Sequence, residues 1–321
     1  MRRFLLTTVS VLAITICGAV SRLSADNIMD VNVTNVDPRY RNTFLQAEAF
    51  WESRLLGYSP LLPAQVRSQL TRLQINAQTA AIDGVGGILG SAGPTNVVRW
   101  GGPGPKQFQS RPIAIATSSQ MQFDIADIVS LQQTGSLLDV VKHEMGHALG
   151  FGSLWNDNGL LTTILGGPQY TGTYGLGKYR TESGNRFARF VPVEQQGGGG
   201  TAGGHWEDND PFFNKRGTLR QSELMIGSID PGNETKYTTE TTWASLADLW
   251  FIVKGINDPQ IYVRPRPSPT PWKWGGGPPL FIRGNGPSSV PEPSSMIALA
   301  LGGIATAVVY SRRRRGNGLA T

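Results

Sequence analysis

Two histidines and a glutamate in one short segment have the types and spacing of a zinc site. Residues 140–155 read VVKHEMGHALGFGSLW and place His143, Glu144 and His147 in the pattern H-E-x-x-H. In a helix, residues four apart lie on the same face, so both imidazoles would face one ion with Glu144 beside them. Catalytic zinc sites usually have three protein ligands, and this segment supplies only two.

The histidine content of the chain predicts the third ligand. The sequence contains three histidines, and the one outside the motif is His205. We predict that His205 completes the metal site, although 57 residues separate it from His147. Glu182 and Glu194 are the alternative ligands, of carboxylate type. One zinc ion is the expected cofactor, since three neutral imidazoles would leave a fourth position open for water.

The segments before the motif predict the elements that hold it. The active-site helix is expected at about 135–150, ending at Gly150. A helix is predicted within residues 41–58 from apolar side chains at helical spacing, and strands within 71–83 and 111–124 from alternation and β-branched residues. Residues 84–96 are rich in glycine and are predicted to form a loop.

The segments after the motif are predicted to be mostly irregular. Residues 151–204 carry many glycines without a clear period, which predicts a long irregular insertion. A last helix is expected at 241–253, and residues 263–289 read as a proline- and glycine-rich linker. Asp124 and Asp127 precede the helical segment and are expected to cap it, with support of the metal site as the alternative.

The distribution of charge argues against nucleic-acid binding. The formal net charge is +6, but seven of the 29 basic residues lie near the chain ends, and they are Arg2, Arg3, Arg22 and Arg312 to Arg315. Residues 26–289 contain 22 basic and 22 acidic side chains. The body of the protein is therefore neutral, and the basic balance belongs to the termini.

Both termini read as targeting segments. Residues 1–25 combine arginines, an apolar run and small residues, which is typical of a secretory signal peptide; a retained anchor is the alternative. The single cysteine, Cys17, lies in this segment, so we expect no disulfide in the exported protein. At the other end, VPEP at 290–293 is followed by an apolar segment at 296–310 and then four arginines.

This C-terminal arrangement resembles the PEP-CTERM sorting signal of bacterial envelope proteins. The resemblance implies an exosortase-type processing enzyme as a partner and at least transient contact of residues 296–310 with the membrane. It also implies export to the cell envelope or the extracellular space, with the protein anchored or released through the signal. An ordinary C-terminal membrane anchor is the alternative interpretation.

The metal-site residues also carry a resemblance. HEMGHALGFGSLW, GGHWEDND and ELMIGSID resemble segments of the leishmanolysin-like zinc metallopeptidases, a branch of the metzincins. Most metzincins have a third histidine where this chain has Ser153, but leishmanolysin-like enzymes insert a long segment first. The resemblance supports His205 as that ligand and assigns Met225 to the Met-turn, an apolar floor beneath the zinc. No tyrosine closely follows Met225, so a fifth ligand of that type is not expected.

The resemblance further implies the fold. We expect an α+β metzincin-type fold whose N-terminal subdomain has a twisted mixed sheet and two long helices. The C-terminal subdomain would be largely irregular with a late helix. Metzincins bind extended substrates along an edge strand, and Ile113–Asp124 is the candidate for that edge; an ordinary strand within the sheet is the alternative. The expected organisation is a signal peptide at 1–25, a zinc metallopeptidase domain at 26–262, the linker, a sorting signal at 290–315 and a short tail at 316–321.

These observations favour a secreted zinc-dependent endopeptidase that hydrolyses proteins or peptides. Glu144 would act as the general base that takes a proton from the attacking water. The main alternative is a surface or extracellular-matrix binding protein that retains a non-catalytic zinc site. A zinc hydrolase that acts on other bonds is a third hypothesis, which only the metzincin resemblance disfavours.

Overall fold

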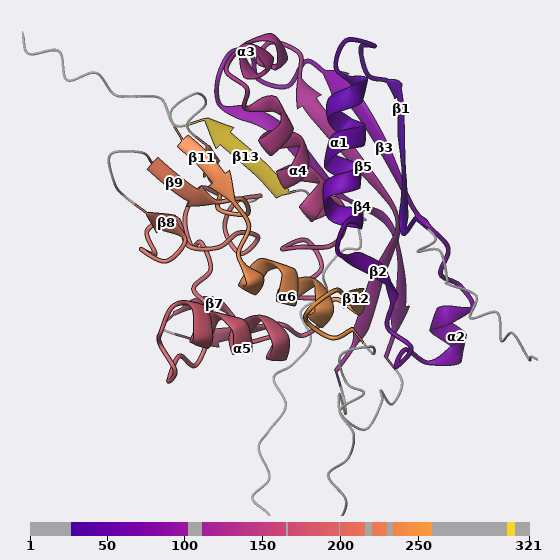
Figure 1. The fold of residues 1–321 in the computed structure, drawn as a ribbon, viewed down its shortest axis with the longest axis vertical. Helices are drawn as coiled ribbons and strands as arrows, with labels where there is room; N and C mark the ends of the chain where they lie inside the picture. Colours follow the sequence, from indigo (N-terminus) through magenta and orange to yellow (C-terminus); the bar gives the residue numbers. More distant parts are fainter. Residues whose placement is uncertain are drawn as a thin grey trace, which may run out of the picture.

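The computed structural model describes a mixed α+β protein (Figure 1). It covers residues 27–101 and 111–258, except for 165, 199, 216–219 and 230–233, together with the backbone of 307–311. The predicted signal peptide, the linker, residues 316–321 and the sorting signal other than 307–311 lie outside the described residues. Among the described residues, no helix is long and apolar enough to cross a membrane.

The main sheet is mixed, as predicted for the N-terminal half. Four strands follow one another in the order β1 (Met29–Asn35), β3 (Leu73–Ala80), β5 (Ile113–Asp124) and β4 (Ile88–Trp100). The first three are parallel, and β4 is antiparallel to β5. Two short strands extend the sheet beyond β4, first β13 (Ala307–Ser311) and then β10 (Ser228–Ile229).

Two helices of 12 residues each pack against this sheet. They are α1 (Arg41–Glu52) and α4 (Leu137–Ala148), which lie side by side over the sheet in Figure 1. Phe44 of α1 meets Phe123 of β5 edge to face at 5.0 Å, and the indole N–H of Trp51 donates to the carbonyl of Lys142 at 3.0 Å. The predicted active-site helix is therefore present, anchored by α1 and preceded by α3 (Ile128–Gln133).

Three predictions about the N-terminal half are wrong. The segment predicted as a glycine-rich loop belongs mostly to β4, where a Cβ on Gly90 would lie 3.1 Å from atoms of both Phe123 and Glu144. Glycine avoids a tight contact there because a helix side chain approaches the strand closely. The predicted edge strand, β5, is interior because β3 and β4 occupy its two sides.

The third error concerns the two aspartates before α3. Asp127 is the residue before the helix, but its side chain makes no capping hydrogen bond. The carboxylates of Asp124 and Asp127 instead accept backbone N–H groups of the loop at Asp83, Gly84 and Gly86. These side chains fix the loop that leads into β4, which leaves the start of α3 without the predicted cap.

The C-terminal half is more regular than predicted. It contains a second helix, α5 (Thr173–Glu182), besides the late helix α6 (Glu240–Asp248). Small sheets join β6 (Leu161–Ile164) to β7 (Gly167–Tyr170), and β11 (Glu234–Tyr237) to β9 (Arg220–Glu223) and β8 (Asn214–Lys215). The short helix α2 (Ala64–Arg67) lies in the N-terminal half, and so does β2 (Leu55–Tyr58), which pairs with the C-terminal strand β12 (Phe251–Val253).

The late helix is shorter than the predicted 241–253 because the backbone turns at Trp250, which has a φ of 74°. Its last residue, Asp248, is buried and ties α6 to α5. The carboxylate accepts the hydroxyl of Tyr170 at 2.8 Å and the backbone N–H groups of Tyr174 and Gly175. This contact joins α6 to the start of α5.

Candidate metal centre

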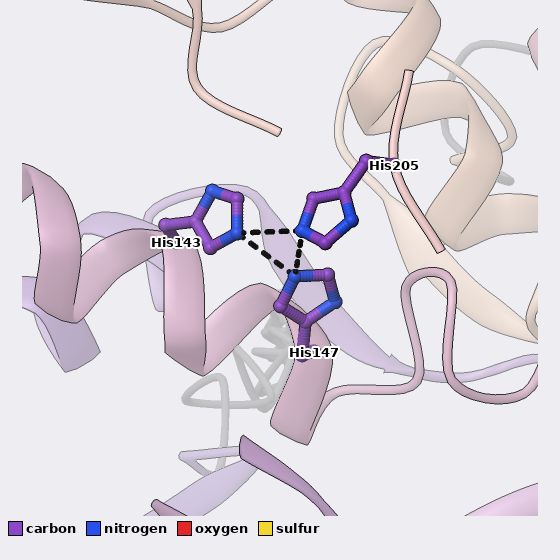
Figure 2. Close-up of side chains that lie close together, drawn as sticks. All are labelled: His143, His147 and His205. Carbon is purple, nitrogen blue, oxygen red and sulfur yellow. Dashed lines mark hydrogen bonds between the residues drawn. The ribbon is translucent and has the colours of Figure 1, made fainter. Parts of the chain in front are cut away.

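Three histidine side chains meet in the interior between the two halves (Figure 2). The Nε2 atom of His147 lies 2.9 Å from the Nε2 atoms of His143 and His205, and those two are 3.1 Å apart. The side chains are 4%, 0% and 0% exposed for His143, His147 and His205. The prediction that His205 joins the two motif histidines agrees with this geometry.

The contacts of the Nδ1 atoms show which nitrogen of each imidazole ring carries the proton. The Nδ1 atoms of His143, His147 and His205 lie 2.6, 2.9 and 2.9 Å from the backbone carbonyls of Leu224, Phe151 and Thr201. A carbonyl oxygen only accepts, so each Nδ1 carries the ring proton. The three Nε2 lone pairs therefore point at one another, which is an arrangement that a shared cation stabilises.

The environment keeps all three rings neutral. Burial holds the pKa of His143 and of His147 well below the usual value, and the neighbouring histidines lower both further. Burial lowers the pKa of His205 to about 4. Neutral imidazoles are the form that binds a metal ion, so the cluster is ready to bind one at neutral pH.

The ligand set fits a metal ion such as zinc. Two nitrogens bound to zinc at 2.0–2.1 Å with tetrahedral angles are separated by about 3.4 Å, close to the 2.9–3.1 Å between the Nε2 atoms here. Each Nδ1 donates to a backbone carbonyl, as second-shell partners of metal-bound histidines commonly do. Imidazole also suits copper, iron and nickel, so the donor atoms alone favour a metal without fixing its identity.

The chain returns His205 to the helix through two close backbone contacts. Gly152, with a φ of 68°, lies so near Gly204 that a Cβ on it would be 2.0 Å from the Gly204 carbonyl oxygen. Beyond the ligand, the Trp206 backbone N–H donates to the carbonyl of Met225 at 3.1 Å. Trp206 is completely buried and stacks on Phe213 at 5.4 Å. Aromatic packing thus fixes Trp206, the residue that follows the ligand His205.

Ser153, which stands where the commoner metzincin pattern has histidine, has a different task. Its hydroxyl donates to the carbonyl of His147 at 2.7 Å, so it satisfies one of the free carbonyls at the end of α4. The alternative carboxylate ligands are engaged elsewhere. Glu182 accepts the N–H groups of Glu240 and Thr241, and Glu194 accepts those of Gln196 and Asp208.

Glu144 contrasts with the carboxylates that have partners. It is 0% exposed, and neither of its oxygens has a hydrogen-bond partner among the described residues. Burial raises the pKa of Glu144 well above its usual value. A buried carboxyl without a donor is costly unless something compensates it. A cation bound by the adjacent histidines, or a water beside it, would favour the charged form.

Met225 lies against the same helix. Its side chain is completely buried, and a Cβ on Gly146 would lie 2.8 Å from its Sδ and Cε atoms. Gly146 sits between the two motif histidines, so the thioether packs directly beneath the metal-site turn of α4. The backbone N–H of Met225 donates to the carboxylate of Glu223, which is itself completely buried.

Some supporting residues were not predicted. Glu223 also accepts the Thr242 hydroxyl at 2.6 Å and the Thr239 N–H at 3.2 Å, and so connects the Met225 turn to the start of α6. A glutamate two residues before a methionine carries no signal by itself. The glycines at 90 and 152 were visible in the sequence, but only the close approaches explain them.

Comparison with known proteins identifies one part of the chain. Residues 289–315 match the model of the PEP-CTERM protein-sorting motif. This match confirms the predicted sorting signal and indicates exosortase-dependent sorting to the cell surface or exterior. No curated protein matches the chain at a significant level. The remaining residues therefore define a class by structure alone, an α+β protein with a buried three-histidine cluster.

Proposed function

We propose that this protein is an exported zinc-dependent endopeptidase of the metzincin type. One observation carries the proposal: three converging imidazole lone pairs lie next to a buried glutamate that has no partner among the described residues. A site that only stabilised the fold would have no use for that carboxyl. The main alternative, a surface binding protein with a non-catalytic zinc site, leaves Glu144 unexplained.

The residues of the chain would divide the work as follows. His143, His147 and His205 hold the ion, which when bound lowers the pKa of water and polarises a carbonyl group. Glu144 takes the proton of the attacking water and returns it to the leaving amine. Met225 forms the apolar floor beneath the helix. The metzincin resemblance supports these roles, together with the packing of Met225 against Gly146.

We further propose that an extended substrate lies along the outer side of β4. This strand is the last of the four central strands, and in this structure β13 pairs with part of its outer side. Its residue Gly90 lies against the Cγ atom of Glu144. A peptide that added itself to β4 would bind through its main chain and pass the proposed base. A cavity of about 380 Å³ is lined in part by Glu194, Asp208 and Gly227, and a Cβ on Gly227 would lie 3.7 Å from the Cγ atom of His205.

The test combines metal content with proteolysis. We would measure zinc stoichiometry and casein cleavage for the wild type, Glu144→Gln and His205→Ala. The C-terminal tail would be cut off after folding, at a protease site inserted within residues 263–289. The proposal expects one zinc per chain and cleavage by the wild type, zinc without cleavage for Glu144→Gln, and weakened zinc binding for His205→Ala. Zinc binding without cleavage of any protein in a broad panel would favour the binding-protein alternative.

A further inference from the structure

One buried carboxylate joins the segments around the third histidine. Glu223, the last residue of β9, is completely buried. Its Oε2 atom accepts the backbone N–H of Met225. Its Oε1 atom accepts the Thr239 N–H at 3.2 Å and the Thr242 hydroxyl at 2.6 Å. The carboxylate thus contacts both the turn at Met225 and the first turn of α6.

These contacts belong to a closed ring of hydrogen bonds that passes through the residue after His205. The indole N–H of Trp206 donates to the hydroxyl of Thr242 at 2.8 Å, and this hydroxyl donates to Glu223. The backbone N–H of Trp206 donates to the carbonyl of Met225 at 3.1 Å, and the N–H of Met225 donates to Glu223. All four side chains are completely buried. The ring therefore fixes Trp206 through its side chain and through its backbone.

The ring holds two segments that face the metal-site helix. His205 reaches the cluster from a segment separate from the helix that carries His143 and His147 (Figure 2). Met225 packs against Gly146 of that helix. The positions of the third histidine and of the apolar floor relative to α4 therefore depend on the same hydrogen bonds.

Stability alone does not account for a carboxylate at this place. Burial raises the pKa of Glu223 to about 7, although its three hydrogen-bond donors and the charge of Lys236 act in the opposite direction. A buried charge costs free energy, and well-packed apolar side chains often serve a fold equally well. A carboxylate differs from an apolar side chain because it fixes the positions of the donors around it.

We infer that Glu223 is a positioning residue of the metal centre, which holds His205 and Met225 where metal binding and catalysis require them. Glu223 would act through Trp206 and Thr242 rather than by touching the ion or a substrate. The catalytic part of this inference rests on the proposed function, whereas the part about metal binding does not.

Glu223→Gln tests the inference in the full chain. Each oxygen of Glu223 accepts a backbone N–H, so a glutamine amide presents its NH₂ group to one of them whichever way it turns. Zinc affinity is measured by competition with a chromophoric chelator at a pH of about 8, where the wild-type carboxylate is charged. We expect zinc binding about tenfold weaker than in the wild type. The visible spectrum of the cobalt-substituted protein should change as well, because it reports the ligand geometry.

Asp248→Asn is the matched control. Asp248 is also a buried carboxylate that accepts three hydrogen bonds, from the Tyr170 hydroxyl and from the N–H groups of Tyr174 and Gly175. None of these partners belongs to the ring. Asp248→Asn should lose stability in urea unfolding of the metal-free protein and keep its zinc affinity. Equal zinc affinities of Glu223→Gln and Asp248→Asn would overturn the inference, since Glu223 would then serve the fold alone.

Thr242→Val opens the ring at a second position and keeps the shape of the side chain. It removes the hydroxyl between Trp206 and Glu223, so it should also weaken zinc binding. Because both changes open one ring, the double variant should bind zinc no more weakly than Glu223→Gln alone. Ser245→Ala, which removes a buried hydroxyl that donates to the Thr242 carbonyl within α6, should bind zinc like the wild type. Fully additive losses in the double variant would contradict the inference.

Hydrolysis of a fluorogenic peptide separates this inference from the proposed function. Zinc-saturated Glu223→Gln should have a kcat about tenfold lower at an unchanged KM, because the ring positions the ligands of the ion and not the substrate. If no form cleaves any peptide but the zinc affinities differ as expected, Glu223 positions the metal and the peptidase proposal fails. Wild-type zinc affinity and a wild-type cobalt spectrum in both Glu223→Gln and Thr242→Val would refute the positioning role.

Discussion

The contact between Gly152 and Gly204 gives the sharpest test of how the third histidine is placed. In Gly152→Ala, the new Cβ would lie 2.0 Å from the carbonyl oxygen of Gly204 and 2.7 Å from its carbon. Real Cβ contacts are essentially never below 3.0 Å, so the backbone directly before His205 must move by about 1 Å. Metal–ligand distances tolerate only about 0.2 Å.

We therefore expect Gly152→Ala to lose the contribution of His205 to metal binding. Weakening a partner of a metal ligand typically lowers affinity by about 10- to 100-fold, and displacement of the ligand itself should lower it by roughly 100-fold or more. The positive φ of 68° adds a separate cost in stability of about 1–2 kcal/mol when glycine is replaced. Competition with a chromophoric chelator measures the zinc affinity, and urea unfolding of the metal-free protein measures the stability.

Gly184→Ala is the matched control for this experiment. Gly184 has a similar φ of 74°, but a Cβ added there would meet nothing within 4 Å. It should lose about the same stability from backbone strain and keep its zinc affinity. If Gly152→Ala bound zinc within threefold of Gly184→Ala, the crossing of the two glycines would not position the ligand and the reasoning would be refuted.

Three further predictions address the proposed base Glu144, the buried carboxyl of Glu223 and the hydrogen bond between Tyr170 and Asp248. Gly90→Ala should crowd the proposed base and lower peptide hydrolysis at unchanged zinc content, whereas Gly101→Ala, with open space around it, should not; equal rates would contradict this. Burial raises the pKa of Glu223 from 4.5 to about 7, against the hydrogen bond from Thr242. Between pH 4.5 and 7 the folded metal-free protein therefore keeps a proton on Glu223 that the unfolded chain releases, and its stability falls by about 3 kcal/mol over this range. Glu223→Gln should remove this dependence in urea titrations. Tyr170→Phe should cost about 1 kcal/mol in unfolding free energy through the lost hydrogen bond to Asp248; thermal melts matching the wild type would show that this bond adds nothing.

Local patterns were enough to predict the elements that carry their own signal. The helix with His143 and His147, the helix with Phe44, the strand at 73–80 and the sorting motif follow from periodicity or motif alone. Strand β4 was missed because its glycines erase the alternation that marks a strand. The reason for those glycines is the approach of an α4 side chain, which the sequence of β4 does not contain.

The insertion was the hardest segment to interpret. Its helix α5 was not predicted, because its glycines, Gly175 and Gly177, weaken the helical pattern. Tertiary contacts compensate for this weakness, since Asp248 accepts two backbone N–H groups at the start of α5. The same dependence on distant partners explains why the role of Glu223 at the Met225 turn could not be foreseen.

The sequence by itself determined the chemistry available to this protein. It contains three histidines, one glutamate beside two of them, and a C-terminal signal for export. Only the tertiary structure decided that the distant histidine meets the other two, because that meeting depends on two glycine backbones passing within contact distance and on a buried tryptophan holding the next residue.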